Sequence, residues 1–144
     1  MHVSEVQQVF NQPTILIVED QITQRKLLVK LMEKWFADHY LLVEASNGQE
    51  AIDFFKLNRR SIHLITMNIQ MPKVDGLQAI GHIRELEGWS NERYPVRVPI
   101  VVISTAIERF RGQLTALKCN ALVPVPYEST VLSAIIKNTL QHYK

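Results

Sequence analysis

The sequence is poor in cysteine and glycine: its 144 residues include one cysteine, Cys119, and five glycines. A single cysteine can build neither a disulfide framework within the chain nor a zinc cluster. No apolar run approaches the roughly 18–20 residues of a membrane-spanning helix. The first ten residues also lack the basic and then apolar order of a secretory signal. These absences predict a soluble, cytoplasmic domain that contacts no membrane.

An excess of one charge is missing as well. Sixteen lysines and arginines stand against fourteen aspartates and glutamates, and the two signs are interleaved along the chain. A nucleic-acid-binding domain concentrates Lys and Arg on one face, so we expect no nucleic-acid contact. The turn after the first apolar run has no glycine, which argues against a phosphate-binding loop there.

Short apolar runs alternate with amphipathic segments along the chain. We expect strands at 14–18, 41–45, 62–67, 99–104 and 123–125, and helices at 22–36, 49–57, 76–86, 107–117 and 129–143. Unbroken β-branched runs are typical of strands buried on both faces of a parallel sheet. The alternation predicts an α/β three-layer sandwich in one domain, residues 14–144. Residues 1–13 form a weakly patterned extension, for which a docked helix and a loose chain are both open.

Polar residues stand where the predicted strands end. Glu19 and Asp20 follow the first strand, Asn68 follows the third, and Thr105 follows the fourth. In an open parallel sheet the carboxyl ends of the strands share one edge, and ligands gather outside that edge. We therefore expect the functional site there, with Asn68 as the residue to explain.

Four motifs resemble those of the receiver domains of two-component response regulators: ILIVEDQ (15–21), MNIQMPKVDGLQAI (67–80), PIVVISTA (99–106) and the pair Pro126-Tyr127. The resemblance covers nearly everything from Thr14 to Leu140. It implies a flavodoxin-like fold with five helices and a five-stranded parallel sheet in the order 2-1-3-4-5. It also implies a domain that accepts a phosphoryl group from a histidine kinase onto an aspartate, with bound Mg²⁺.

The resemblance places four residues in the phosphorylation site. Glu19 and Asp20 match the acidic pair that helps to hold the metal, and Gln70 falls where a backbone carbonyl ligates it. Asn68 falls on the phosphoryl-accepting position, where the reaction needs a carboxylate nucleophile that an amide does not supply. The change from Asp to Asn also removes one negative charge, so Mg²⁺ affinity should fall. We expect no cofactor, with weak Mg²⁺ binding at Glu19, Asp20 and Gln70 as the alternative.

Four further positions follow from the same resemblance. Thr105 and Leu122 fall on the two switch positions, and Leu122 lacks the aromatic ring often found there. Val125 falls on the position of a lysine that contacts the phosphoryl group, and an apolar side chain cannot supply that charge. Pro126 matches the proline after it, and the bond between Val125 and Pro126 is a candidate for the cis form.

The two departures, Asn68 and Val125, favour a degenerate receiver, or pseudo-receiver. We expect a non-enzymatic signalling module that acts by protein–protein contact and not by aspartyl phosphorylation. In the family, the face of the fourth helix, fifth strand and fifth helix often docks an output domain or joins two copies. Candidate contact residues on that face are Arg109, Arg111, Lys118, Tyr127, Glu128 and Lys137. The segment 88–98 is expected to be an irregular loop, with Trp89 and Tyr94 as candidate interface aromatics.

Two alternatives stay open. The first is a phosphorylatable receiver of a response regulator or hybrid histidine kinase, seen as an Asp-to-Asn variant, which predicts that Asn68→Asp restores phosphoryl transfer. The second is a flavodoxin-like ligand-binding domain or enzyme, which predicts a small-molecule pocket near Asp20, Asn68 and Thr105.

Overall fold

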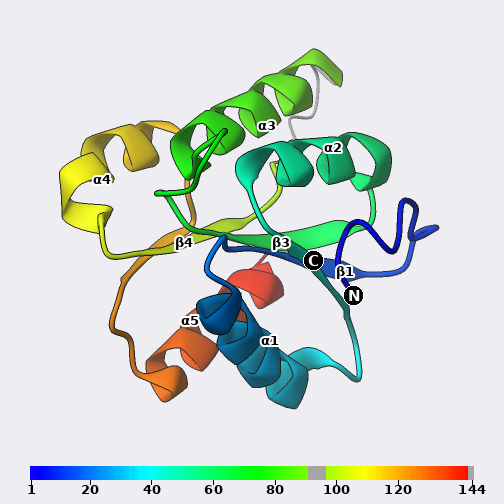
Figure 1. Cartoon of the computed structure of the whole chain (residues 1–144), viewed down its shortest axis with the longest axis horizontal. Coiled ribbons are helices and arrows are strands. Elements are labelled where there is room, and N and C mark those ends of the chain that lie inside the picture. The colour runs from blue at the N-terminus through cyan, green and yellow to red at the C-terminus, as the bar shows by residue number, and fades with distance from the viewer. Residues whose placement is uncertain (91–96, 143–144) are drawn as a thin grey trace.

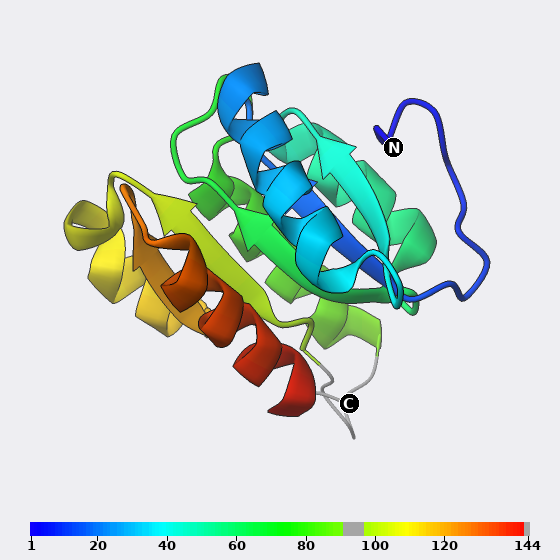
Figure 2. The same cartoon turned by 90° about the horizontal axis from the view of Figure 1, so that it is seen from below.

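The computed structural model describes residues 1–90 and 97–142. Within these residues, five parallel strands pair in the order β2-β1-β3-β4-β5. Helices α1 and α5 cover one face of the sheet, and α2, α3 and α4 cover the other (Figures 1 and 2). This arrangement confirms the predicted flavodoxin-like three-layer sandwich. No helix of the described residues is long and apolar enough to cross a membrane.

The strands are β1 (Thr14–Val18), β2 (Leu41–Ala45), β3 (Ile62–Met67), β4 (Ile100–Ser104) and β5 (Ala121–Pro124). The helices are α1 (Ile22–Phe36), α2 (Gly48–Asn58), α3 (Gly76–Ser90), α4 (Ile107–Ala116) and α5 (Ser129–His142). Each predicted element is present; four have the predicted boundaries, and the others differ by at most four residues at either end.

Two boundaries differ for identifiable reasons. Helix α3 continues to Ser90, through a stretch predicted as loop, and its last turns are bonded to the segment before β4: the buried Glu87 accepts from the N–H of Val98, and Arg84 donates to the carbonyl of Val98. Strand β5 starts at Ala121 because the preceding Asn120 already bonds to β4: its N–H donates to the carbonyl of Ile100, and its Oδ1 accepts from the N–H of Ile100. Tyr94 and the side chain of Trp89 lie outside the described residues.

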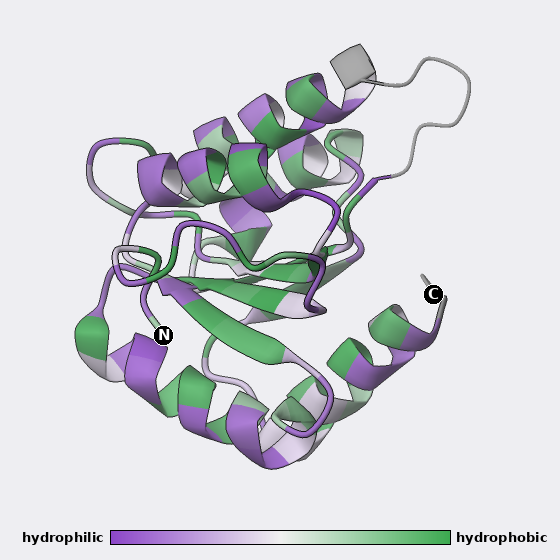
Figure 3. Cartoon of the chain, turned by 90° about the vertical axis from the view of Figure 1, so that its right-hand side faces the viewer, coloured by the Kyte–Doolittle hydropathy of each residue, from purple (hydrophilic) through white to green (hydrophobic). Residues whose placement is uncertain are grey.

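The strands bury apolar side chains on both faces of the sheet. In β1, Ile15 and Ile17 face the layer of α1 and α5, whereas Leu16 and Val18 face the layer of α2, α3 and α4. Figure 3 shows apolar strands at the centre and alternating polar and apolar positions on the helices around them. Burial on both faces explains why the strands read as unbroken apolar runs.

One buried ion pair joins α1 to β2. The Nε atom of Arg25 lies 3.0 Å from Oε1 of Glu44, and Nζ of Lys26 lies 3.0 Å from Oε2. The side chains of Arg25 and Glu44 are only 7% and 5% exposed. Burial alone would raise the pKa of Glu44, but the hydrogen bonds from Lys26 and Arg25 bring it below its ordinary value of 4.5. Glu44 is therefore charged at neutral pH.

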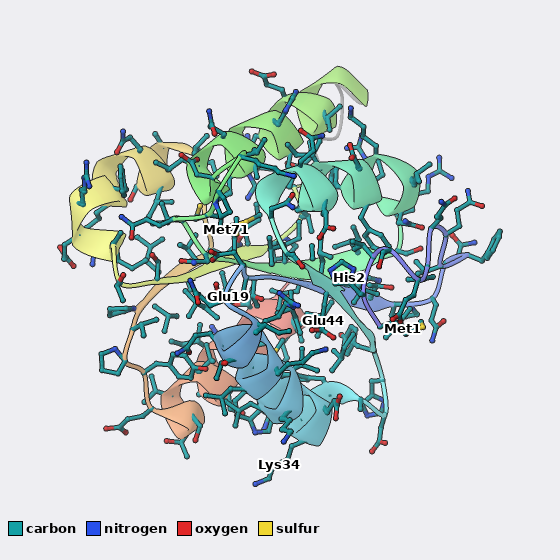
Figure 4. The ribbon with its side chains drawn as sticks, viewed as in Figure 1. Met1, His2, Glu19, Lys34, Glu44 and Met71 are labelled. Atoms are coloured by element: carbon teal, nitrogen blue, oxygen red, sulfur yellow. The ribbon has the colours of Figure 1, made fainter. Side chains whose placement is uncertain are left out.

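The N-terminal extension is neither a docked helix nor a loose chain. His2 pairs with Glu44 in parallel, as an added strand would, at the outer edge of β2. Figure 1 shows this segment beside β2, and Figure 4 shows Met1 and His2 on the same side of the molecule as Glu44. The sequence of the extension shows no strand pattern because only its first few residues pair with β2.

We expect Glu44→Leu to lower the free energy of unfolding by about 3–5 kcal/mol, because it leaves Arg25 buried without a counter-charge. Urea unfolding followed by circular dichroism would measure the loss. The double variant Arg25→Met/Glu44→Leu should lose clearly less, since it buries no unpaired charge. Equal losses in the two variants would show that packing alone, and not the ion pair, matters at this position.

The same pair gives an expected pH dependence. The folded-state pKa of Glu44 lies below 4.5, so the stability it contributes is present above the unfolded-state pKa and is lost as pH falls through the folded-state value. The unfolding free energy of the unaltered chain should therefore fall more steeply below about pH 4.5 than that of the double variant.

Candidate functional site

The candidate site lies at the carboxyl ends of β1 and β3, where neighbouring strands hold the chain as each strand ends. The N–H of Asn68 donates to the carbonyl of Val18 over 3.1 Å, and the N–H of Glu19 donates to the carbonyl of Ala45 over 3.1 Å. Figure 4 shows Glu19 at the centre of the view, near the sheet. These bonds fix the residues that follow the two strands beside one another.

The Asn68 amide points into the acidic cluster. Its Nδ2 atom lies 3.2 Å from Oε2 of Glu19, 3.4 Å from Oδ1 of Asp20 and 3.2 Å from the carbonyl oxygen of Gln70. The two hydrogens of one NH₂ group are thus shared among three oxygens. The Asn68 side chain thus connects residues of two motifs that are far apart in the sequence, ILIVEDQ and MNIQMPKVDGLQAI.

The three oxygens are of the type that binds hard cations, and the amide donates toward all of them. A cation bound among them would need oxygen ligands directed inward, whereas Asn68 directs hydrogens inward. In residues 1–90 and 97–142, no three or more His, Cys, Asp or Glu side chains form a group that could hold a metal ion. In this arrangement the NH₂ group of Asn68 bonds to the three oxygens that a cation would need.

The acidic cluster perturbs the groups around it. Burial raises the pKa of the Glu19 carboxyl, the N–H of Gln21 opposes that rise, and Asp20 adds to it. Tyr127, in the loop after β5, interacts electrostatically with the same cluster: burial raises the pKa of its phenol, and the charge of Glu19 raises it further. The hydrogen bond from Asn68 lowers the pKa of Glu19, so the amide stabilises the ionised form of this carboxylate.

Gly76 allows the loop after β3 to return to Asn68. Its N–H donates to the carbonyl of Ile69 over 2.7 Å, and a Cβ atom at Gly76 would lie 2.0 Å from the carbonyl oxygen of Asn68. The preceding Asp75 caps α3: its Oδ1 accepts from the N–H of Gln78 over 2.8 Å. The sequence predicts the cap, but the need for glycine follows only from this close approach.

The remaining predicted positions lie along β4 and β5. Thr105 directly follows β4 and is exposed, whereas Leu122 is half-buried against the layer of α2, α3 and α4. Val125 is half-buried against the layer of α1 and α5, and its bond to Pro126 is cis. The hydroxyl of Ser104, one residue before Thr105, accepts from the N–H of Ala106 over 3.1 Å.

The predicted contact residues are exposed with one exception, Tyr127. Arg111 is paired with Glu108 on the same helix, and the guanidinium of Arg109 lies over the ring of Phe110. Tyr127, a candidate anchor, is half-buried and packs against the core layer of α1 and α5. The other five predicted residues are exposed: Arg109, Arg111, Lys118, Glu128 and Lys137.

Lys137 differs from the expectation in its neighbours. It lines a hollow of about 400 Å³ between α5 and α1, together with Lys34 and Trp35 of α1. The residue therefore belongs to the α1–α5 side of the molecule. Its position in sequence did not distinguish between the two sides of α5.

This arrangement of fold and site can be compared with known proteins. The model of the response regulator receiver domain matches residues 15–136. The chain belongs to the response regulator receiver domain family. The match begins and ends inside the sheet-and-helix domain, and it leaves the N-terminal extension of this receiver outside.

Individual relatives agree with this assignment. Protein-glutamate methylesterase/protein-glutamine glutaminase 4 of Myxococcus xanthus is 40% identical over 111 residues, which are 75% of this chain and 28% of that protein. The autoinducer 1 sensor kinase/phosphatase LuxN of Vibrio campbellii is 35% identical over 98 residues, 67% of this chain and 10% of LuxN. The solved receiver domain of a signal transduction histidine kinase from Syntrophus aciditrophicus has 27% identity and a TM-score of 0.72, with 92% of each chain covered.

The receiver thus spans less than a third of the length of both curated relatives.

Sequence reasoning did not single out Arg25, which holds the backbone at the acidic cluster: its Nη1 donates to the carbonyl of Glu19 over 2.9 Å. A charged residue among the apolar positions of α1 was the available signal, because a buried arginine requires a partner.

We expect Gly76→Ala to lower the free energy of unfolding by about 1–3 kcal/mol, because the new methyl group forces the backbone of Asn68 to move. Chemical denaturation would measure the loss. Gly81→Ala in the same helix is the matched control, since a Cβ atom there meets nothing within 4 Å, and it should stabilise by up to about 1 kcal/mol. Two variants of equal stability would refute the close approach at Gly76.

Proposed function

We propose that this receiver is a pseudo-receiver, a signalling module that acts by protein–protein contact and is not switched by aspartyl phosphorylation. The observation that carries the proposal is the Asn68 amide, which donates to Glu19, Asp20 and Gln70 at the phosphoryl-accepting position. The family membership supplies the context of two-component signalling.

The chemistry of Asn68 supports the loss of phosphoryl transfer. Attack on a phosphohistidine needs an electron-rich carboxylate oxygen. The amide nitrogen of Asn68 is delocalised and is directed toward two carboxylates, and neither feature makes the amide a nucleophile. The phosphoryl group carries negative charge, and Glu19 and Asp20 would repel it without a bound cation.

The same geometry supports independence from Mg²⁺. The NH₂ group of Asn68 supplies partial positive charge to the oxygens of Glu19, Asp20 and Gln70, as a cation would. A carboxylate at position 68 would instead add a third negative charge to the cluster, which a cation then has to offset. Asn68 therefore stabilises the cluster by hydrogen bonds from within the chain.

Val125, directly after β5, supports the proposal from a second position. In receivers that transfer phosphoryl groups, the lysine expected at this position stabilises the group electrostatically. Here Val125 packs against the apolar layer of α1 and α5. Full phosphoryl transfer would thus need changes at two positions, one directly after β3 and one directly after β5.

A module that is not switched by phosphorylation would act by contact with another protein or domain. Both curated relatives are much longer than this chain, so their receiver-like regions are parts of larger proteins. We place the contact on the exposed part of α4, β5 and α5, where Lys118, Glu128 and the 50%-exposed Val131 lie. The module itself would carry out no chemical reaction.

We expect the unaltered chain to gain no phosphoryl group when it is incubated with Mg²⁺ and acetyl phosphate, and intact-mass spectrometry measures this directly. Asn68→Asp restores the nucleophile and should be labelled slowly. The double variant Asn68→Asp/Val125→Lys also restores the positive charge and should be labelled faster.

The variant Val125→Lys with Asn68 unchanged is the matched control, and it should stay unlabelled because it still lacks a nucleophile. Labelling of the unaltered chain would refute the proposal. Labelling of Asn68→Asp as fast as the double variant would instead support the reading of an ordinary receiver silenced at one residue.

A further inference from the structure

The first nine residues form an arm (residues 1–9) that pairs with the outer edge of β2. The N–H of Val3 donates to the carbonyl of Glu44 over 2.8 Å, and the N–H of Glu44 donates to the carbonyl of Met1 over 2.7 Å. The amino group of Met1 also donates to the carbonyl of Leu42 over 3.0 Å. The arm thus satisfies backbone groups that an open sheet edge would leave unpaired.

Side chains anchor the arm near its start. The imidazole of His2 lies between two partners on the segment after β2: its Nε2 is 2.8 Å from the hydroxyl of Ser46 and 3.3 Å from Oε1 of Glu50. Its Nδ1 contacts the hydroxyl of Ser4 over 2.9 Å. These contacts add side-chain specificity to the backbone pairing.

A second anchor holds the end of the arm. The side chain of Asn58, at the end of α2, accepts from the N–H of Val9 over 2.9 Å and donates to the carbonyl of Gln7 over 2.7 Å. Asn58 and Val9 are both 5% exposed, and Val3 and Val6 pack against the same apolar core. The docking site for the arm is therefore built from β2 and α2 along its whole length.

The hinge between the arm and β1 is strained. Phe10 has a φ of 43° and Asn11 a φ of 66°, a region that disfavours residues with a side chain and especially a bulky one such as Phe. Phe10 is 83% exposed, so burial of its ring does not offset this strain. The N–H of Gln12 donates to the carbonyl of Val9 over 3.0 Å and closes the turn.

We propose that two copies of this chain join by exchanging their arms at the outer edge of β2. The hinge at Phe10 and Asn11 straightens, and each arm makes with the second copy the contacts that it otherwise makes with its own β2 and α2. Straightening relieves the left-handed backbone at both hinge residues. Because each copy gives one arm and receives one, the dimer is closed and two-fold symmetric.

The contacts of His2 and Asn58 favour a second copy of this chain as the partner that binds the outer edge of β2. Any extended peptide could pair with the backbone of Glu44, but this edge also contacts an imidazole through Ser46 and Glu50. Five residues beyond that imidazole, Asn58 bonds to the backbone of the arm. The arm of a second copy meets these requirements without new complementarity. This interface does not involve Asn68 and is independent of the proposed loss of phosphorylation.

The oligomeric state of the full chain tests the exchange. In sedimentation velocity, the unaltered chain should show a dimer, at twice its mass of 16.6 kDa, whose fraction rises with concentration. Deletion of Phe10 and Asn11 removes the turn and should convert nearly all of the protein to dimer. The matched variant Phe10→Gly/Asn11→Gly relaxes the strain in the closed arm and should raise the dimer dissociation constant by roughly ten-fold.

The position of the arms in the dimer is tested by isotope-filtered nuclear Overhauser spectroscopy on a mixture of labelled and unlabelled copies. Cross-peaks between His2 of one copy and Ser46 of the other are expected. An unaltered chain that stays monomeric up to millimolar concentration overturns the proposal. A dimer that lacks these cross-peaks, or that is equally stable in the glycine variant, overturns it as well, because the copies would then join through another face.

Discussion

The buried residue Glu44 connects three parts of this receiver: helix α1, the N-terminal arm and, through Arg25, the acidic cluster. Its oxygens bind Arg25 and Lys26 of α1, and its backbone pairs with the N-terminal arm. Arg25 in turn holds the carbonyl of Glu19, whose side chain accepts from Asn68. A charge taken out of water must be paired, and here the pairing joins the arm, β2, α1 and the acidic cluster in one continuous set of contacts.

The core explains how the fold can persist while the site changes. Apolar side chains fill the spaces above and below the sheet, and the acidic cluster lies at the carboxyl edge, outside those layers. A change from Asp to Asn at position 68 therefore removes no apolar contact. Asn68 is uncharged and bonds to Glu19 and Asp20 directly, so it adds no third negative charge to the acidic cluster.

The predictions were correct where a segment is specified by its own pattern, as in the strand before Glu19 and the start of the helix capped by Asp75. Predictions failed where a distant residue decides the local structure. Asn120 starts β5 early through its bonds to Ile100, and Glu87 near the end of α3 accepts from the N–H of Val98. The partners lie in different segments of the chain. The spacing of apolar residues within one segment therefore does not indicate these bonds.

The sequence by itself determined the fold class, because burial periodicity is a local property. The resemblance of its motifs to the receiver family implied the strand order and the residues at the candidate site. Only the tertiary structure decided what these residues do to one another: that one amide reaches Glu19, Asp20 and Gln70, and that Gly76 must lack a side chain beside Asn68. It alone also placed the arm on β2. Hydrogen bonds and close approaches depend on ångström-scale distances between segments, and these distances exist only once the sheet has brought the segments together.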